Sequence, residues 1–239
     1  VLAFEHRTGS WASAGYATAA YRKLVEAILA RETGWESLAG AQDRAQFFLP
    51  YLAHEEPSLR MLAYLEVGQS SYDTIRQADA FVPAGQVYQF LDDPRYLEWQ
   101  RLYILLLGVN AGEREKQLIR SELQNRAEFN RTLNLSAWAT ALIEIDGEQA
   151  INWLEANYLA LPDRDVDAVL EVVKALSVHG ALRFSKLRRR IATSYGALIQ
   201  THPSLAGWAA RDLAAWQDWR FADRFAEIRA SQPFMDSSA

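Results

Sequence analysis

The 239-residue chain contains no cysteine. This absence excludes disulfide bonds, thiolate zinc sites, cysteine nucleophiles and thiolate-bound iron–sulfur clusters. The chain also lacks a long apolar run. Leu102–Val109 is the longest obvious one, far short of the roughly 18 residues that a membrane-spanning helix needs. Strand signals are nearly absent, because there is no Asn-Gly turn and no sustained alternation of β-branched residues. We therefore expect no transmembrane segment and no β-rich fold.

Recognisable catalytic motifs are missing as well. There is no Gly-x-Ser-x-Gly, no Gly-x-x-x-x-Gly-Lys and no Gly-x-Gly-x-x-Gly after a strand. The four histidines are His6, His54, His179 and His202, and no two of them are three or four residues apart. We expect them to have capping or surface roles. We assign no catalytic residue, no metal and no cofactor.

Two groups of acidic residues have a second interpretation. His54-Glu55-Glu56 with Glu66 would suit a divalent cation, although a solvated turn before Pro57 is the more ordinary interpretation. Asp163, Asp165 and Asp167 surround a predicted helix start, where negative charge stabilises the helix dipole. As carboxylates of a glycosidase they would need a second partner.

The composition is that of a folded globular chain. Half of the residues are hydrophobic, 23% are charged, and the net charge is −5. Such a chain can build a substantial core in one large domain or two small ones. The negative charge argues against nonspecific nucleic-acid binding, so we expect no nucleic-acid partner. The chain begins at Val1, which favours an exported, periplasmic protein over a cytoplasmic one and leaves a trimmed piece as the alternative.

Helical periodicity covers most of the chain, and breaks recur in it. Gly112, Gly147, Gly180 and Asp218 follow apolar helix ends at intervals of 35, 33 and 38 residues. Between the breaks we expect paired helical segments: 135–145 with 150–159, 165–178 with 182–199, and 204–216 with 221–228. This spacing is typical of stacked helix pairs.

The first 92 residues are less regular. We expect a long helix over Ser13–Arg31, a loop over Thr33–Gly40, and a helix pair over 43–53 and 58–68 in which Pro50 kinks or shortens the first helix. Two short helices near 72–81 and 84–91 should follow. No linker divides the chain, so we expect a single domain over 1–239. Its parts are an N-terminal helix and loop (1–41), stacked helix pairs (42–230) and a frayed tail (231–239).

Over about residues 42–230, the helix pairs and their spacing resemble the HEAT-like α-solenoid superfamily. Tetratricopeptide repeats have a similar period, but their Trp-x-x-Leu-Gly-x-x-Tyr signature is missing. Phe47–Val67 and Asp212–Trp219 are also similar to segments of uncharacterised bacterial exported proteins of HEAT type. The resemblance implies an all-α fold, a right-handed α-solenoid of about six antiparallel helix pairs, and it implies no activity.

Tryptophans divide into two groups. Five fall on apolar helical stripes and are expected in the core: Trp99, Trp138, Trp153, Trp208 and Trp216. Trp11, Trp35 and Trp219 lie near ends or loops and are the better candidates for a contact surface.

The charges are distributed unevenly along the chain. Ala141–Glu171 holds eight acidic residues and one base, Arg164, whereas Val172–Arg211 holds seven bases and no acid. On a helix over Leu182–Ile199, a stripe of Arg183, Lys186 and Arg190 lies beside the apolar face, with Arg189 pointing away from the core. These bases either pair with neighbouring helices or form a basic patch for an acidic protein, an anionic polymer or a lipid headgroup.

We therefore predict a noncatalytic scaffold or protein-binding subunit of a larger bacterial assembly. Arg183, Lys186, Arg189 and Arg190 are the predicted contacts to an acidic protein partner, and peripheral membrane contact stays open. The alternative is a helical enzyme, or an accessory domain of one, that acts on a polymer such as glycan. The sequence does not indicate an oligomeric state.

Overall fold

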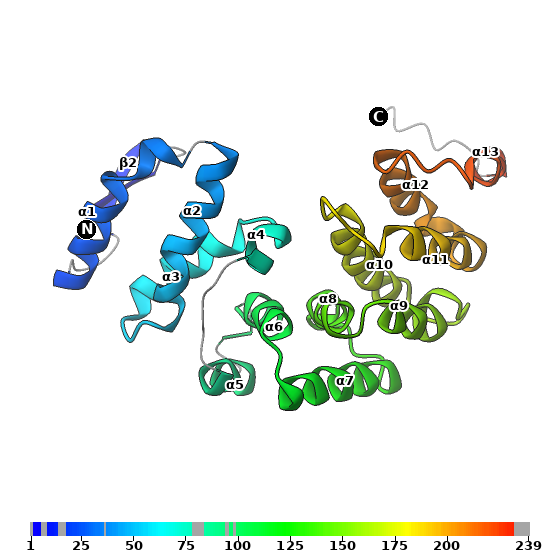
Figure 1. The fold of residues 1–239 in the computed structure, drawn as a ribbon, viewed down its shortest axis with the longest axis horizontal. Coiled ribbons are helices and arrows are strands. Elements are labelled where there is room, and N and C mark those ends of the chain that lie inside the picture. Colours follow the sequence, from blue (N-terminus) through cyan, green and yellow to red (C-terminus); the bar gives the residue numbers. More distant parts are fainter. Residues whose placement is uncertain are drawn as a thin grey trace. The chain divides into compact units, whose positions relative to one another are not determined.

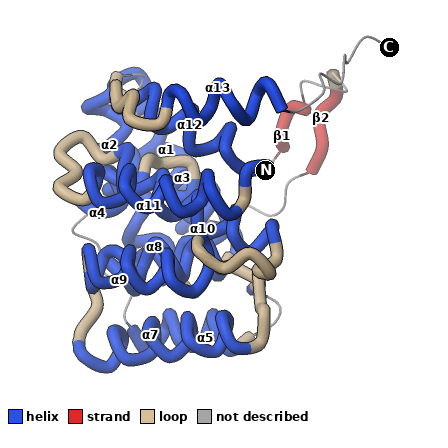
Figure 2. The backbone as a smooth tube through the Cα atoms, turned by 90° about the vertical axis from the view of Figure 1, so that its right-hand side faces the viewer, coloured by secondary structure: helices blue, strands red, loops and turns tan. Residues whose placement is uncertain are grey.

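The computed structural model describes residues 2–5, 9–13, 18–35, 37–77, 84–93, 96–97 and 99–231. The backbone is predominantly α-helical, as predicted (Figures 1 and 2). It contains two compact units, Val1–Pro83 and Ala84–Ala239. The single domain expected over 1–239 stays a prediction, and residues 232–239 of the expected frayed tail lie outside the described residues.

The first unit combines a short hairpin with helices. In the described ranges the only strands are β1 and β2, which pair antiparallel with Leu2 opposite Ser13. The elements are β1 (Leu2–Glu5), β2 (Ser10–Ser13), α1 (Ala19–Leu29), the 3-10 turn η1 (Glu32–Gly34), α2 (Leu38–Phe48), the 3-10 turn η2 (Leu49–Ala53), α3 (Pro57–Gly68) and α4 (Tyr72–Gln77). The long helix expected over Ser13–Arg31 is therefore shorter, because Ser13 belongs to β2.

Local side-chain chemistry explains where the helices of this unit begin and end. The Thr18 hydroxyl oxygen accepts a 3.0 Å hydrogen bond from the Tyr21 amide and so caps α1. Helix α2 ends at Phe48, and the turn η2 that follows contains Pro50. The prediction that Pro50 shortens this helix is confirmed, since proline cannot donate the backbone bond that an α-helix requires.

In the residues that the structure describes, the second unit contains no strands and is built from helices. They are α5 (Ala84–Asp92), α6 (Gln100–Val109), α7 (Glu113–Glu128), α8 (Leu135–Asp146), α9 (Glu148–Leu154), the π-helix η4 (Glu155–Leu159), α10 (Val166–Ala181), α11 (Arg188–Thr201), the 3-10 turn η5 (Pro203–Leu205), α12 (Ala206–Ala215) and α13 (Ala222–Ser231). Every helical segment predicted between 135 and 228 has a counterpart here. The largest difference is in α11, which begins six residues later than expected.

The even-numbered helices of this unit contact one another in order. Helix α6 packs on α8, α8 on α10, and α10 on α12, while α7 packs on α8 and α11 on both α10 and α12. Helix α8 has the largest buried share among the helices of this unit. Eight of its 12 residues are buried, including Trp138 at 3% exposure. Figure 1 shows α6, α8 and α10 adjacent in this part of the chain. The core of the unit therefore lies around α8.

Small residues allow α6 and α8 to approach closely. A Cβ atom added at Gly108 of α6 would lie 2.8 Å from both Cα and Cβ of Ala141 in α8. Replacing Gly108 by alanine should therefore lower the free energy of unfolding by about 1–2 kcal/mol, because the clash outweighs the helix propensity that alanine gains. Urea denaturation measures this. A Gly108→Ala/Ala141→Gly double variant should recover part of the loss. Full additivity of the two changes would contradict the proposed contact.

Three of the four predicted breaks coincide with helix ends. Gly112 precedes α7, Gly147 separates α8 from α9 with a φ of 56°, and Asp218 follows α12. Gly180 is different, because it lies inside α10, which continues to Ala181. A Cβ atom at Gly180 would lie 2.2 Å from Cζ2 of Trp216, so glycine is needed there for close packing and not for a turn.

Two histidines are structural and buried. His179 is 2% exposed and its Nε2 lies 2.9 Å from the Thr140 carbonyl oxygen, while His202 is 5% exposed and its Nε2 lies 3.0 Å from the Leu161 carbonyl oxygen. Because a carbonyl oxygen only accepts hydrogen bonds, both Nε2 atoms carry the proton. The expectation of surface roles is wrong for these two residues. Each joins segments about forty residues apart in the sequence.

Candidate functional site

A short loop over residues 182–187 joins α10 to α11. Two hydrogen bonds from the Arg188 guanidinium fix this loop. Its Nε donates to the Gly180 carbonyl at 2.8 Å, and its Nη2 donates to the Leu182 carbonyl at 2.7 Å. These bonds satisfy carbonyl groups that the end of α10 leaves without helical partners. The expected helix over 182–187 is wrong, because Arg188 caps α10 and the chain turns there before α11 begins.

This loop and the first turn of α11 place three of the four predicted basic residues at the surface. Arg183, Lys186 and Arg189 are exposed, and none of them forms an ion pair with a described residue. Phe184, which the sequence placed on the apolar face of a helix, is 82% exposed, and the Arg183 guanidinium carbon lies 5.2 Å from its ring centroid. We call Arg183, Phe184, Lys186 and Arg189 the basic surface.

Arg190 has a different role from the other three bases. Its Nε donates to Asn152 Oδ1 and its Nη2 donates to Glu155 Oε2, both at 2.7 Å, and its side chain is 22% exposed. Arg190 therefore ties α11 to α9 and η4 and is not available as the free contact that the sequence predicts.

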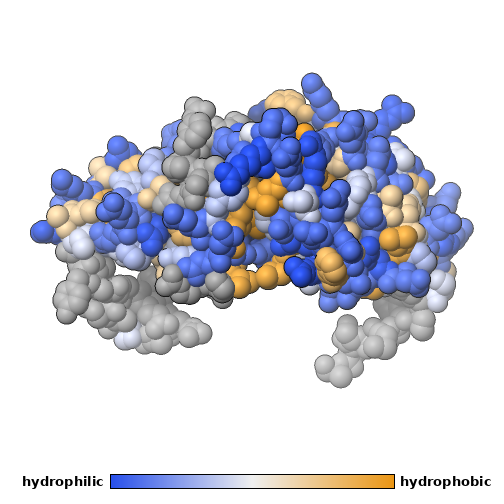
Figure 3. Space-filling view, turned by 90° about the horizontal axis from the view of Figure 1, so that it is seen from below, coloured by the Kyte–Doolittle hydropathy of each residue, from blue (hydrophilic) through white to orange (hydrophobic). Residues whose placement is uncertain are grey.

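Isolated apolar residues at a surface are normal, and Figure 3 shows small hydrophobic groups on a mostly hydrophilic face. Phe184 differs in the degree of its exposure. It is the most exposed of the large apolar side chains in the part of the chain that the structure describes. A phenylalanine in water with a guanidinium beside it can bury apolar area and supply charge at the same place.

The acid-rich segment is partly neutralised within the second unit. Asp146 binds Arg120 through two hydrogen bonds of 2.8 and 2.6 Å, Glu155 binds Arg190, and Glu171 binds Lys174 at 2.5 Å. Asp165 caps α10 by accepting from the Asp167 amide at 2.7 Å, as its position at a helix start predicts. Pairing with η4 therefore accounts for Arg190, and pairing within α10 accounts for Lys174, but neither accounts for the basic surface.

The group around His54 is used internally. His54 Nδ1 accepts from the Glu56 amide at 3.0 Å, and the Glu56 carboxylate accepts from the hydroxyls of Thr18 and Ser58, each at 2.7 Å. These two hydroxyl donors lower the pKa of Glu56. Glu66 pairs with Arg44 at 2.5 Å. Among the described residues no three potential metal-binding side chains gather at one point.

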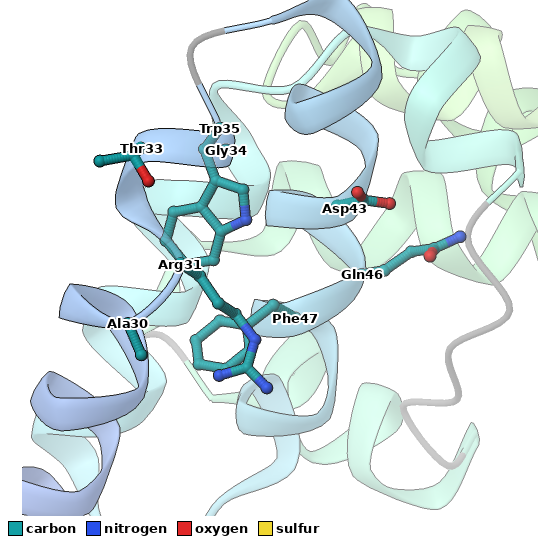
Figure 4. A pocket seen from close by; sticks show the side chains of 8 residues that line it. All are labelled: Ala30, Arg31, Thr33, Gly34, Trp35, Asp43, Gln46 and Phe47. Atoms are coloured by element: carbon teal, nitrogen blue, oxygen red, sulfur yellow. The ribbon is translucent and has the colours of Figure 1, made fainter.

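A cavity of about 600 Å³ opens in the first unit, between the end of α1, η1 and α2. It is lined by Ala30, Arg31, Thr33, Gly34, Trp35, Asp43, Gln46 and Phe47. Figure 4 shows the Trp35 indole broadside to the viewer, with its nitrogen on the side of Asp43 and Gln46. The sequence singled out Trp35 as a candidate for a contact surface, and its side chain is half-buried. We call this the aromatic cavity.

Packing between aromatic rings holds Trp35 in place. Its ring centroid lies 5.3 Å from that of Phe47 and 5.8 Å from that of Phe48, and both pairs are tilted. The Arg44 guanidinium carbon lies 5.8 Å from the Trp35 centroid, and Arg44 is fixed by Glu66. Arg44 is not among the residues that line the cavity.

The second unit has a smaller cavity of about 210 Å³. It is lined by residues of α7, α8 and α9, namely Arg120, Leu123, Gln124, Leu142, Asp146, Gln149, Ala150 and Trp153. Its two charged groups bind each other, since Asp146 is the partner of Arg120 and raises the pKa of that guanidinium. The charges in this cavity are therefore already matched.

Five buried polar side-chain atoms that the sequence analysis did not identify have no hydrogen-bond partner among the described residues: Arg60 Nε, Arg126 Nε, Trp138 Nε1, the Tyr158 hydroxyl and Arg190 Nη1. The Arg126 guanidinium carbon lies 5.2 Å from the Trp138 ring, and that of Arg164 lies 4.8 Å from the Tyr158 ring. Burial raises the pKa of Tyr158 and lowers the pKa of Arg126. Helical periodicity marks Trp138 and Tyr158 as core residues but cannot show whether their polar atoms find partners.

Comparison with protein families, with curated proteins and with solved structures finds no match to this chain. In the described part of the chain, the helices are too short or too polar to cross a membrane. The basic surface and the aromatic cavity are therefore interpreted from their own chemistry.

Proposed function

We propose that this protein is a noncatalytic helical-repeat scaffold that binds an acidic protein partner through the basic surface. Within this proposal the chain is a right-handed α-solenoid of about six antiparallel helix pairs, HEAT-like, in an exported bacterial assembly. The ordered contacts of α6, α8, α10 and α12 support stacked helix pairs, because each repeat in such a fold contacts mainly its neighbours. The recurrent breaks at Gly112, Gly147 and Asp218 agree with it.

The observation that carries the proposal is the exposed Phe184 beside unpaired cations. Transfer of a phenylalanine side chain from water into an interface contributes about 1.5–3 kcal/mol. Cations around such an anchor steer an acidic partner and raise its association rate. Arg188 fixes the loop before binding, which reduces the entropy lost on association.

The test is capture of partners from the native source, identification by mass spectrometry, and measurement of Kd with the purified partner. An Arg183→Glu/Lys186→Glu variant should weaken binding at least tenfold, about 1.4 kcal/mol, because two attractive charges become repulsive. Phe184→Ala should weaken it by a similar factor. Binding by the unchanged protein should decrease as salt is raised.

A matched control is available on α1. Arg22 and Lys23 are exposed, and an Arg22→Glu/Lys23→Glu variant changes the net charge by the same amount. It should bind within twofold of the unchanged protein. Equal losses in the two variants would point to net charge rather than to the basic surface. Arg190 is unsuitable for this test, because its loss breaks the contact with Glu155.

The alternative, a helical enzyme or accessory domain acting on a polymer such as glycan, has narrower support. A glycosidase needs two carboxyl groups about 5–10 Å apart across the substrate. Asp163, Asp165 and Asp167 line neither cavity described above, and Asp43 is the single carboxylate among the residues that line the aromatic cavity. The aromatic cavity is the one feature that favours a glycan, and it favours binding of a glycan rather than its hydrolysis.

A further inference from the structure

We propose that the aromatic cavity is a binding subsite for a neutral saccharide, accommodating one or two pyranose rings. This site lies within Val1–Pro83 and is independent of the basic surface. Its volume of about 600 Å³ falls in the range of about 300–1,000 Å³ typical of small-molecule sites.

Trp35 supplies the platform for a sugar ring. The face of an aromatic ring carries partial negative charge, and the axial C–H groups of a pyranose are weakly positive, so the two surfaces attract. Figure 4 shows the indole among the side chains that line the cavity, and its contacts with Phe47 and Phe48 hold it in place. A guanidinium lies over one face of each cavity ring, Arg31 at 5.1 Å from the Phe47 centroid and Arg44 at 5.8 Å from the Trp35 centroid. Arg31 lines the cavity and Arg44 does not, so Trp35 is the main platform, and one platform suits a short saccharide.

Polar side chains around the platform match the hydroxyl groups of a sugar. Thr33, Asp43 and Gln46 line the cavity and have no hydrogen-bond partner among the described residues. A carboxylate accepts from two vicinal hydroxyls, an amide both donates and accepts, and a threonine hydroxyl does either. Arg31 uses Nη1 to donate to the Ala27 carbonyl at 3.1 Å, and its other guanidinium N–H donors have no partner among the described residues. These groups can therefore bind several hydroxyls at once.

The charge balance selects a neutral ligand. Arg31 is the one cation and Asp43 the one anion among the residues that line the cavity, so the lining carries no net charge. A phosphate or a nucleotide would face Asp43 without a second cation to compensate for the repulsion. A neutral polyhydroxyl molecule uses both groups without that cost.

The experiment is saturation-transfer NMR on the full chain with cellobiose, maltose and N,N′-diacetylchitobiose, titrated to about 10 mM, well above the millimolar Kd that an open site of this kind should have. At least one of the three should give saturable transfer to its ring protons. Trp35→Ala should weaken that binding at least tenfold, and Asp43→Ala at least threefold.

Trp219→Ala is the matched control, because Trp219 is 67% exposed and lies in the other unit. It should leave binding within twofold. Trp35 contacts Phe47 and Phe48, so Trp35→Ala could fail to fold; Asp43→Ala and Gln46→Ala then decide, since both side chains are exposed and unpartnered. Three results would overturn the proposal. They are absence of transfer for all three sugars, transfer that rises without saturation, and a loss of binding in Trp219→Ala equal to that in the cavity variants.

Discussion

Replacing Gly180 by alanine is expected to lower the free energy of unfolding by about 2 kcal/mol. The new Cβ would lie 2.2 Å from Cζ2 and 2.3 Å from Cη2 of Trp216. The indole cannot move away freely, because it stacks on Tyr195 at a centroid distance of 5.9 Å and an interplanar angle of 10°. The clash therefore outweighs the roughly 1 kcal/mol that alanine gains over glycine inside a helix. Thermal unfolding should show a loss of about 4–8 °C.

The matched control for this substitution is Gly207→Ala. Gly207 lies in α12, and a Cβ atom added there meets nothing within 4 Å. This variant should be as stable as the unchanged protein or more stable, by up to about 1 kcal/mol. If Gly180→Ala behaves in the same way, then the Trp216 ring has room and the packing described for α10 and α12 is wrong.

Replacing Tyr195 by phenylalanine is expected to lower the free energy of unfolding by about 1.5–3 kcal/mol, the usual contribution of a hydrogen bond to a charged group. The Tyr195 hydroxyl donates to Asp212 Oδ2 at 2.7 Å, and both residues are buried. Without that donor, the Asp212 carboxylate keeps only Arg211, at 3.3 Å, as a partner among the described residues. Urea denaturation at pH 8 measures the loss.

Tyr158→Phe is the control for loss of a buried hydroxyl as such. The Tyr158 hydroxyl has no hydrogen-bond partner among the described residues, so its removal should be nearly neutral or stabilising. If both variants lose the same free energy of unfolding, then removal of a buried hydroxyl, and not loss of the bond to Asp212, determines the effect of Tyr195→Phe.

The Tyr195–Asp212 pair also predicts how stability depends on pH. Burial, followed by the charge of Asp212, raises the pKa of Tyr195 well above its ordinary value. Above about pH 10 the unfolded chain loses this proton while the folded protein keeps it, so stability falls by up to about 1.4 kcal/mol per pH unit. Tyr88 and Tyr158 also have raised pKa values and contribute to the same slope. The stability difference between the unchanged protein and Tyr195→Phe should therefore narrow above pH 10. A constant difference between pH 8 and pH 11 would contradict this assignment.

Much of the helical architecture follows from local pattern. The apolar spacing around Trp138 and the acidic cap at Asp165 predict α8 and the start of α10 to within one residue. Both are short-range signals that tertiary packing reinforces. The hairpin of β1 and β2 gave no such signal, since each strand has four residues and the chain between them lacks a recognised turn dipeptide.

The candidate sites were less predictable than the helices. The helix predicted through Phe184 and Leu187 does not form, because Arg188 binds the carbonyls at the end of α10. The spacing of apolar residues cannot predict a hydrogen bond between a side chain and a backbone carbonyl. Arg183 and Lys186 remain exposed, but on a loop, whereas Arg190 is taken up by Glu155. The aromatic cavity is formed where residues 30–35 meet α2, so sequence analysis could name Trp35 without placing Asp43 and Gln46 beside it.

The π-helix η4 is a place where the length of this chain can change by one residue. Its turn is closed by a bond from the Ala160 amide to the Glu155 carbonyl at 2.9 Å, so it holds one residue more than an α-helical turn. Ala160 therefore stands where the fourth residue after Glu155 would stand in an α-helix, and deletion of one residue between them would restore α-helical geometry without rotating the segments on either side. In a regular helix such as α8 or α10, the same deletion would rotate everything after it by about 100°. Single-residue insertions and deletions that arise during evolution should therefore be tolerated at η4 more readily than inside α8 or α10.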